Sequence, residues 1–535
     1  MPGNIILLSG PISSGKSTLG LILQNRCNAR LFKTNELIRE HYPKLPDERE
    51  AFQKARERLD RRTKGAWVKE SLARKDFSVV DTVIVDCVRI KNQINQIRSA
   101  FGARVFHIHL TASDEELERR YSQRKSKIAE LPTYEQVRKS RTERNVSRLA
   151  QYADIVVLTD RCTKEDVFIR AAARLGLYPR DTHELVDVLV GGQYGSEGKG
   201  NIAAYIAPEY DILLRVGGPN AGHTVFGEPN QVYHHLPSGT IRAQNAKLVI
   251  GPGAVIDPDT LLREISTYQV RHDRLAIDPQ AMVIRPLDIK YEKDNLTKIS
   301  STAQGVGAAT ARKINHRGKF DSKKNSKVTL AKDVSELKPF IGETYSIIEN
   351  AFLDQKKIFL EGTQGTSLSL HHGIYPYVTS RDTTVSGCLA EAGISPKRVR
   401  RIIMVCRTYP IRVGGPSGPM SQGREITSKE IAKRSGLTID EIDSIEVTTT
   451  TGKPRRFAEF DWTQLRKSAI LNGATDIALT FADYLDVRNR EARRFEQLRK
   501  ETINFVEEVE RVSGVPVNLI STRFHFRNII DRRPW

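Results

Sequence analysis

The sequence predicts an α/β protein of two domains, because one local pattern occurs twice: an apolar strand, a glycine-rich turn and a helix. The strands are residues 5–9 and 186–190, and the turns are residues 10–18 and 191–200. Further apolar strands alternate with helices after the first copy, which indicates a parallel sheet covered on both faces. Around Pro179 the hydrophobic periodicity is lost. We therefore expect domains at 1–176 and 185–535, joined by a linker at 177–184.

The expected elements of the first domain follow in chain order. Residues 79–80 with 83–85, 105–110 and 155–158 are apolar runs of strand length. Ser113 with Glu116 predicts a capping box for a helix that ends near residue 124, and Thr163 with Asp166 caps the last helix. The second domain should be larger, rich in loops and of mixed α/β type.

Composition restricts the function. The 535 residues carry a net charge of +20, of which residues 1–180 hold +13 (35 basic, 22 acidic) and the remainder +7 (49 basic, 42 acidic). Such a surplus indicates an anionic partner, either nucleic acid or phosphorylated small molecules. No aromatic stacking motif or helix-turn-helix supports nucleic acid. Five scattered cysteines and the lack of a run of about 18 apolar residues argue against disulfides and membrane spans, so we expect a cytoplasmic protein.

The first glycine-rich turn matches the P-loop pattern G-x-x-x-x-G-K-[ST] in full, between a strand and a helix. Gly10 and Gly15 let backbone N–H groups surround a phosphate, and Lys16 adds positive charge. Ser17, followed by Thr18, is the expected Mg²⁺ ligand. Asp86 is either a carboxylate that binds the water molecules around Mg²⁺ or an ordinary acidic residue at a strand end.

Arginines recur at helical spacing later in this domain. They form either a solvated basic face or a lid over transferring phosphates, and they are Arg119, Arg120, Arg124, Arg141, Arg144 and Arg148. The domain resembles the small nucleoside- and nucleotide-kinase group of P-loop proteins. In that group residues 32–39 would hold the acceptor. Asn35 stands where many members have Asp, and Arg39 is the candidate for binding an acceptor phosphate.

The second glycine-rich turn, 191–200, contains Lys199 but is not a P-loop sequence. Four groups of motifs follow it, at 217–224, 361–380, 450–456 and 519–522. Together and in this order they resemble the adenylosuccinate synthetase family, especially its short archaeal and phage-type branch. That family uses a nucleoside triphosphate to phosphorylate O6 of a purine nucleotide, and the amine of L-aspartate then displaces the phosphate.

The resemblance implies a role for each matching residue. His223 is the donor near O6 and the γ-phosphate, the Gly222 carbonyl binds Mg²⁺, and Lys199 binds the triphosphate. The loop residues beside Lys199 are Gly195, Ser196, Glu197, Gly198 and Gly200. The expected purine-nucleotide residues are Asn220, Thr302, Gln364 and Thr379. The expected aspartate-binding residues are Thr451, Lys453 and Arg455. Asp483 would read the guanine of GTP, and Arg317 would reach the nucleotide of a neighbouring subunit, which implies a homodimer.

Ser196 is the departure with the largest consequence, because most members have Asp there, which takes the proton from purine N1. A serine indicates either an inactive paralogue or a different purine. Guanine needs room and a hydrogen-bond acceptor for its 2-amino group, and Ser196 offers both. Phage enzymes that act on dGMP resemble the chain at this position.

Smaller departures leave the phosphate donor open between GTP and an adenine nucleotide such as ATP or dATP. Lys453 replaces the usual Arg, residues 481–483 lack the usual Lys, and residues 521–524 replace a Ser/Thr-x-Gly-Pro segment. The favoured interpretation is a bifunctional enzyme that makes a 2-amino-N6-succinyl-(deoxy)adenylate from (d)GMP, with a P-loop kinase acting on a nucleoside or nucleotide. The alternative is an ordinary synthetase using IMP and GTP, with a regulatory or nucleotide-sensing P-loop domain.

Overall fold

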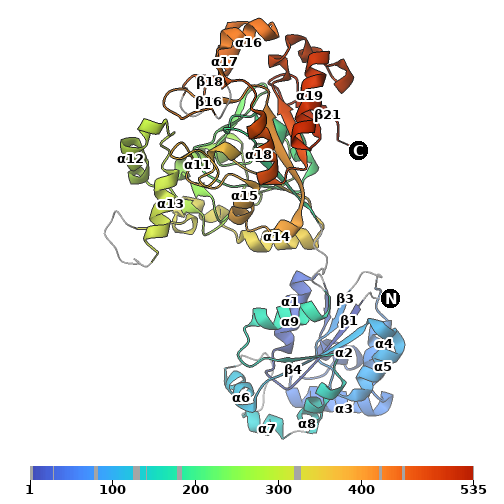
Figure 1. Ribbon diagram of the computed structural model, residues 1–535. Coiled ribbons are helices and arrows are strands. Elements are labelled where there is room, and N and C mark those ends of the chain that lie inside the picture. The colour runs from blue at the N-terminus through green and yellow to red at the C-terminus, as the bar shows by residue number, and fades with distance from the viewer. Residues whose placement is uncertain are drawn as a thin grey trace. The chain divides into compact units, whose positions relative to one another are not determined.

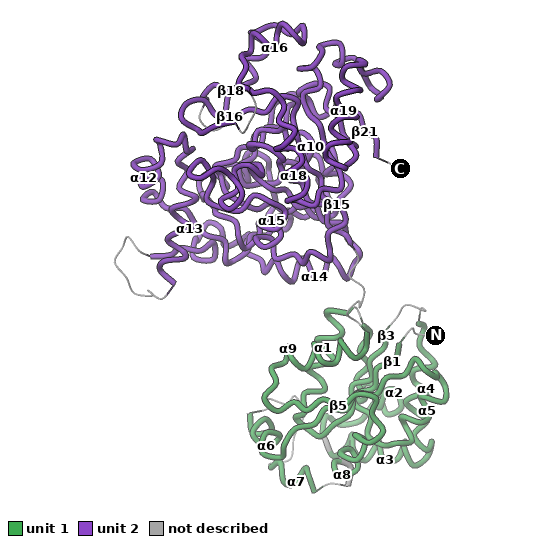
Figure 2. The backbone as a smooth tube through the Cα atoms, in the orientation of Figure 1, with its two compact units in different colours: residues 1–180 green, residues 181–535 purple. Residues whose placement is uncertain are grey.

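The structure, a computed structural model, divides into two compact units, residues 1–180 and 181–535 (Figure 2). It describes residues 4–27, 29–77, 82–123, 133–139, 141–176, 184–317, 327–420, 424–448 and 452–533. The expected linker, 177–184, lies outside these ranges except for Glu184.

The first unit is a five-stranded parallel sheet in the order β2-β3-β1-β4-β5 with helices around it (Figure 1). The strands are β1 (Asn4–Ser9), β2 (Arg30–Phe32), β3 (Thr82–Val85), β4 (Val105–Thr111) and β5 (Ile155–Leu158). The helices are α1 (Lys16–Arg26), α2 (Thr34–His41), α3 (Arg49–Thr63), α4 (Trp67–Ala73), α5 (Lys91–Phe101), α6 (Asp114–Ser122), α7 (Tyr134–Arg138), α8 (Arg141–Ser147) and α9 (Lys164–Arg174).

Alternate residues of β1 enter two separate cores, as the period of a strand requires. Ile5 and Leu7 pack with residues of α3, α4 and α5, whereas Ile6 and Leu8 pack with residues of α1 and α9. The predicted strands at 5–9, 105–110 and 155–158 are confirmed, and so are residues 83–85 of the third. Residues 79–80 lie outside the described ranges.

The two predicted helix caps differ in outcome. Thr163 and Asp166 form the expected capping box. Ser113 accepts the Glu116 backbone N–H at 3.4 Å, but the Glu116 carboxylate bonds to Arg119 and Arg120 and does not return to the cap. The capping box predicted at Ser113 and Glu116 is therefore wrong in its second half, because the guanidiniums of Arg119 and Arg120 bind the Glu116 carboxylate instead.

The second unit contains a nine-stranded sheet in the order β12-β10-β7-β14-β6-β15-β19-β20-β21, parallel except for β21. Its strands are β6 (Val186–Gly191), β7 (Ile212–Arg215), β10 (Lys247–Ile250), β12 (Leu275–Ile277), β14 (Ile358–Glu361), β15 (Val399–Arg407), β19 (Asp476–Thr480), β20 (Val517–Ser521) and β21 (Ile529–Asp531). Smaller sheets pair β8 (His223–Val225) with β9 (Gln231–Tyr233), β11 (Val255–Ile256) with β13 (Met282–Val283), and β18 (Arg455–Ala458) with β16 (Ile411–Val413) and β17 (Glu425–Ile426).

Apolar cores cover both faces of this sheet, and the central strand β6 is therefore buried along its whole length. Val186, Val188 and Val190 point into one core and Leu189 into the other. The helices are α10 (Lys199–Ile206), α11 (Pro258–Thr267), α12 (Pro286–Asn295), α13 (Val306–Asn315), α14 (Thr344–Leu353), α15 (Val385–Ala392), α16 (Ser428–Ser435), α17 (Ile439–Ile445), α18 (Trp462–Asn472) and α19 (Lys500–Ser513). The two-part α/β architecture predicted from the sequence is confirmed.

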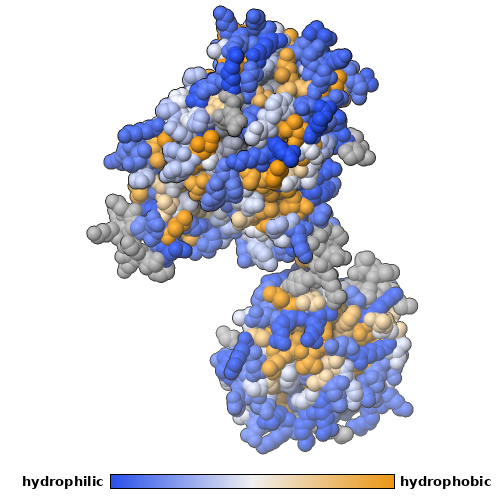
Figure 3. Space-filling view, in the orientation of Figure 1, coloured by the Kyte–Doolittle hydropathy of each residue, from blue (hydrophilic) through white to orange (hydrophobic). Residues whose placement is uncertain are grey.

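Hydrophilic side chains cover much of the visible face of each unit, with apolar patches between them (Figure 3). Within the described ranges, every helix is too short or too polar to cross a lipid bilayer. All five cysteines are described, and all are free thiols.

Candidate active site

Three neighbouring strands of the second unit bring the expected site residues together. β6, β14 and β7 lie side by side and run parallel. The carboxyl ends of parallel strands lie at one edge of a sheet, which is where ligands bind in open α/β sheets. The loops that follow these strands, 192–198, 362–365 and 216–222, therefore meet at that edge although they are far apart in the sequence.

The loop after β6 is folded around the carboxylate of Glu197. Its Oε1 accepts the backbone N–H groups of Gln193 at 3.0 Å and Gly195 at 2.7 Å. Its Oε2 accepts the Lys199 ammonium at 2.7 Å, and the same ammonium donates to the Gly195 carbonyl at 3.0 Å. Gly195 and Gly198 have φ of +97° and +89°, which favour glycine. The loop is thus preformed, with a buried lysine at its centre.

A cavity of about 190 Å³ adjoins this loop. The structure brings to its lining Ser196 and all four residues expected to bind the purine nucleotide, Asn220, Thr302, Gln364 and Thr379. The Thr379 hydroxyl accepts the side-chain amides of Asn220 at 3.4 Å and Gln364 at 3.1 Å. Asn220 Oδ1 is buried without a partner, so an acceptor remains available to a ligand.

The charge of this cavity suits an anion. Among the described residues that line it, two are arginines, Arg412 and Arg455, and none is acidic. The described lining therefore offers no carboxylate that could take the purine N1 proton, either at position 196 or elsewhere. The cavity can hold a phosphorylated ligand without repulsion.

A second, smaller cavity of about 70 Å³ lies over the start of α10. It is lined by Gly198, Lys199, Gly200, His223, Phe226, Phe481 and Phe524, among others. Gly195, Ser196, Gly222 and Arg455 line both cavities. Two ligands bound in the two cavities would therefore meet at these four residues. Transfer of a phosphoryl group from one ligand to the other requires such contact.

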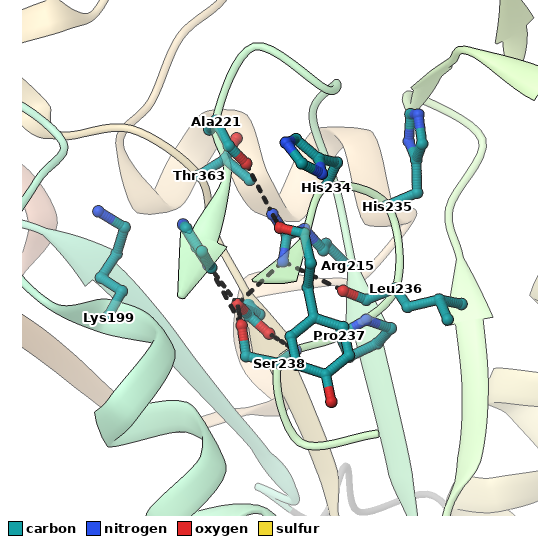
Figure 4. A network of polar contacts seen from close by, with 12 residues as sticks. Lys199, Arg215, Ala221, His234, His235, Leu236, Pro237, Ser238 and Thr363 are labelled. Carbon is teal, nitrogen blue, oxygen red and sulfur yellow. Dashed lines mark hydrogen bonds and ion pairs between the residues drawn. The ribbon is translucent and has the colours of Figure 1, made fainter. Parts of the chain in front are cut away.

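His223 is held by a buried polar network, of which Figure 4 labels Arg215 and Ser238. Its Nδ1 lies 2.5 Å from Oε1 of Glu361. Glu361 also accepts the Ser238 hydroxyl at 2.5 Å, the Ser238 backbone N–H at 2.7 Å and an Arg215 guanidinium N–H at 3.3 Å. His223 Nε2 is buried and has no protein partner. The network thus fixes the ring and leaves one nitrogen for a ligand.

The charges of this network follow from its surroundings. Burial opposes ionisation of Glu361, but Arg215 and His223 outweigh it and lower the pKa of Glu361 to about 2. Burial, reinforced by Arg215, lowers the pKa of His223 to about 4. Glu361 is therefore an ionised acceptor at neutral pH, so the Nδ1 atom of His223 carries the ring proton.

Glu361, Ser238 and Arg215 were not among the residues nominated from the sequence. Arg215 and Glu361 each end an otherwise apolar strand, β7 and β14, and both are buried. A charged residue that closes a buried strand was the available signal. Ser238 lies in a loop and gave no such signal.

Two of the three expected aspartate-binding residues are described. Arg455 lines both cavities, and its Nη1 donates to the buried carboxylate of Glu446 at 3.1 Å. Lys453 is exposed and lines neither of these cavities. Thr451 lies outside the described residues.

Asp483 and Arg317 line neither of these cavities. Asp483 accepts an Arg490 N–H at 3.0 Å on Oδ2, while its Oδ1 is buried without a partner. Burial raises the pKa of Asp483 to about 6. Arg317 is exposed just after α13, and its Nε donates to the Ile314 carbonyl at 3.0 Å.

The first unit has its own phosphate loop between β1 and α1. Gly10 and Gly15 have φ of +142° and +97°, and the Lys16 ammonium donates to the Gly10 and Pro11 carbonyls at 2.8 and 2.6 Å. Burial lowers the pKa of Lys16 to about 8. Ser17 is exposed and Thr18 half-buried in the first turn of α1. The Lys16 ammonium thus lies inside the loop, at the place where a phosphate would bind.

Three other residues nominated in this unit, Asp86, Arg39 and Arg120, have protein partners. Asp86 Oδ1 accepts both the backbone N–H and the hydroxyl of Thr34, at 2.8 and 2.9 Å. Arg39 pairs with Asp47 and lies over the Phe52 ring. Arg120 donates to the Thr159 carbonyl at 2.8 Å and hydroxyl at 2.9 Å, and Arg124 lies outside the described residues.

Comparison with known proteins identifies both units. A family profile for adenylosuccinate synthetase matches residues 188–322 and 320–490, and one described as an AAA domain matches 6–145. Adenylosuccinate synthetases of Pyrococcus sp. (strain ST700) and Methanocaldococcus jannaschii are 36% and 38% identical, over 65% of this chain and 98% and 96% of theirs.

Two solved structures resemble the second unit. One is the cyanophage S-2L succinoaminodeoxyadenylate synthetase bound to dGMP and to dATP as an energy donor, with a TM-score of 0.54 and 28% identity over 66% of this chain and 96% of that one. The other, the fully ligated adenylosuccinate synthetase of Plasmodium falciparum, has a TM-score of 0.54 and 22% identity over 65% of this chain and 100% of that one, so it supports the fold alone.

The fold together with these matches defines a ligase of the α/β class, joined to a P-loop kinase-like domain. More particularly, the chain belongs to the adenylosuccinate synthetase family, over nearly all of its second unit. It is an enzyme of purine biosynthesis of the adenylosuccinate synthetase type.

Proposed function

We propose that the second unit condenses L-aspartate with dGMP or GMP to give a 2-amino-N6-succinyl-(deoxy)adenylate. The observation that carries this proposal is the place of Ser196, which lines both cavities where they meet. A carboxylate there would take the N1 proton of hypoxanthine. A serine hydroxyl offers the guanine 2-amino group space and an acceptor in place of that charge. A related phage synthetase, 28% identical, binds dGMP.

The proposed reaction has two steps. The donor's γ-phosphoryl group moves to O6 of the purine as the bond to the β-phosphate oxygen breaks, and N1 of the purine releases its proton to solvent. The aspartate amine then attacks C6, the C6–O6 bond breaks, inorganic phosphate leaves with the electron pair, and the new nitrogen substituent releases a proton to solvent. Lys199 and His223 would stabilise the charge that develops on the transferring phosphoryl group, and Gln364 would hold the purine.

His223 would act through Nε2, the nitrogen without a protein partner. A bound triphosphate places negative charge beside that nitrogen and raises the imidazole pKa, so the ring can be protonated during transfer. Glu361 would keep the ring oriented and stabilise its positive charge through Nδ1. Glu361 is therefore a positioning residue.

Mg²⁺ and aspartate would complete the site. Gly222 lines both cavities, and its carbonyl oxygen would be an acceptable Mg²⁺ ligand. Mg²⁺ bound there would neutralise triphosphate charge. Arg455, together with Lys453 and Thr451, would bind the two carboxylates of aspartate.

The proposed phosphate donor is ATP or dATP. To read guanine, the Asp483 carboxylate would use both oxygens, but Oδ2 is engaged by Arg490. Phe226, Phe481 and Phe524 line the donor cavity, with the Phe226 and Phe524 centroids 3.6 Å apart. Aromatic rings stack on any base, so this lining suits adenine as well as guanine.

The first unit would be a second enzyme that phosphorylates a nucleoside or nucleotide. Gly10, Gly15 and Lys16 would bind the donor phosphates, and Ser17 with Asp86 would hold Mg²⁺. Arg317 would complete the purine site of a partner subunit, which makes the functional form a homodimer. Its exposure at the end of α13 suits that role.

Product analysis tests the proposal. The chain is incubated with Mg²⁺, L-aspartate and ATP, dATP or GTP, with dGMP, GMP or IMP as acceptor, and products are identified by mass spectrometry. We expect the 2-amino succinyl product. Conversion of IMP alone would establish the ordinary synthetase. Lys16→Ala should abolish transfer to kinase acceptors and spare the ligase, whereas a sensing domain would show no transfer in the wild type.

A further inference from the structure

Arg56 of α3 is a buried arginine that forms no ion pair with a described residue, although the carboxylates of Asp60 and Asp86 act on its charge from farther away. It is 9% exposed, and its Nε is buried with no hydrogen bond. Its guanidinium makes one long hydrogen bond, 3.3 Å to Oδ1 of Asn35, and no ion pair with any described residue. An unpaired buried guanidinium is costly unless an anion accompanies it.

A chain of contacts joins Arg56 to the phosphate loop. Asn35 follows Thr34, which bonds to Asp86 at the end of β3. Arg89 lies three residues beyond Asp86 and pairs with Glu143, whose other oxygen accepts the Ile12 backbone N–H of the phosphate loop at 3.0 Å.

The Arg89 guanidinium pairs with Glu143 but keeps one N–H, on Nε, without a protein partner. Its side chain is 13% exposed, and its Nε is buried without a partner. Burial is the main cause that lowers the pKa values of Arg56 and Lys16, and the positive charge of Arg89 adds to both shifts. The charges of the two arginines and of the phosphate-loop lysine therefore act on one another, in a region that also holds the carboxylates of Asp86 and Glu143.

The residue that faces the Arg56 guanidinium is Asn35, whose neutral amide forms a hydrogen bond but no ion pair. Aspartate at this position, as in many small kinases, would pair with Arg56 and neutralise it. The neutral amide orients the guanidinium through Oδ1 and leaves its charge for a ligand. Arginine is the residue best suited to hold a phosphate by parallel hydrogen bonds.

From this geometry we infer that the acceptor of the first unit is a nucleoside 5′-monophosphate, whose phosphate Arg56 and Arg89 bind. The inference rests on the proposed kinase function and specifies its substrate class. An oxygen of the acceptor phosphate attacks the γ-phosphorus of the donor, the bond to the β-phosphate oxygen breaks, and a nucleoside diphosphate and the donor diphosphate are formed. A phosphate dianion has no proton to lose, so the step needs no general base, unlike attack by a 5′-hydroxyl.

The test uses the full chain with Mg²⁺, ATP labelled at the γ-phosphate, and no aspartate. Acceptors are the four deoxynucleosides and their 5′-monophosphates. The pyrimidines lack the 6-oxo purine that the second unit phosphorylates, so they report the kinase alone. We expect label in nucleoside diphosphates and none in products of nucleosides. Transfer to nucleosides only would overturn the inference and leave the kinase standing, whereas no transfer to any acceptor would overturn both.

Variants then locate the site. Arg56→Gln should raise KM for the monophosphate at least tenfold, and Arg56→Lys, which keeps the charge, should have a smaller effect. Arg58→Gln, on the exposed side of the same helix, is the matched control and should leave KM unchanged. Arg89→Gln should also raise KM, with circular dichroism checking that the loss of its Glu143 pair has not unfolded the unit. Unchanged KM in folded Arg56→Gln and Arg89→Gln would overturn the inference.

Discussion

Replacing Glu361 by glutamine removes the charge that orients His223 and preserves the size of the side chain. The carboxylate accepts hydrogen bonds from His223 Nδ1, the Ser238 hydroxyl and N–H, and Arg215. An amide has one acceptor oxygen, so its NH₂ group must face a donor. A hydrogen bond to a charged group contributes about 1.5–3 kcal/mol, and about 1.4 kcal/mol is tenfold in rate. We therefore expect kcat to fall by roughly 10–150-fold.

The assay is steady-state formation of the succinyl product across a range of pH. Because Glu361 would stabilise protonated His223, its loss should lower the pKa of that imidazole and move the alkaline side of the pH profile to lower pH. Ser238→Ala, which removes one hydroxyl and keeps the carboxylate, should reduce kcat less. A folded Glu361→Gln protein with unchanged kcat and an unchanged pH profile would refute the assigned role.

Three other predictions concern the base, the donor and acid stability. Ser196→Asp should lower kcat/KM for dGMP at least tenfold and raise it for IMP, and competition between the two acceptors measures the change. Asp483→Asn should alter KM for ATP less than twofold, since the proposed donor base does not depend on that carboxylate; a large rise in KM for ATP would contradict this. Burial lowers the pKa values of His107 and His109 to about 4, below the value of about 6.5 in unfolded chains. The unfolded chain thus binds more protons below pH 6.5, and the free energy of unfolding should fall between pH 6.5 and 4. Urea denaturation at pH 7 and pH 5 tests this, and equal midpoints would disagree with it.

The two phosphate loops could be predicted from sequence because each depends on local geometry. Glycines with positive φ at 10, 15, 195 and 198 permit the turns, and a helix begins directly after each loop. Such short-range requirements leave a readable pattern. Strand periodicity likewise predicted β1, β4 and β5.

The contacts between distant segments could not be derived from the residues alone. Thr379 receives hydrogen bonds from Asn220 and Gln364, which is 144 positions from Asn220 in the chain, because β7 and β14 are neighbours in the sheet. Strand order is set by packing across the whole unit, which no local pattern records. The support of His223 by Glu361 has the same origin.

Arg39 shows the limit of a local argument, and its role stays a prediction. Its position on α2 made it a candidate for an acceptor phosphate, but the structure pairs it with Asp47 and places it over Phe52. Arg56, on the next helix, was not nominated because its burial depends on α2 and the loop after β3. A basic side chain in sequence does not reveal whether its charge is already compensated.

The choice of purine is tested most directly by one competition measurement. Equal concentrations of dGMP and IMP are supplied with L-aspartate, Mg²⁺ and saturating ATP, and the two succinyl products are quantified by mass. The ratio of products equals the ratio of kcat/KM for the two acceptors. The place of Ser196 between the two cavities predicts an excess of the 2-amino product of at least tenfold. A product mixture dominated by the succinyl derivative of IMP would contradict the account.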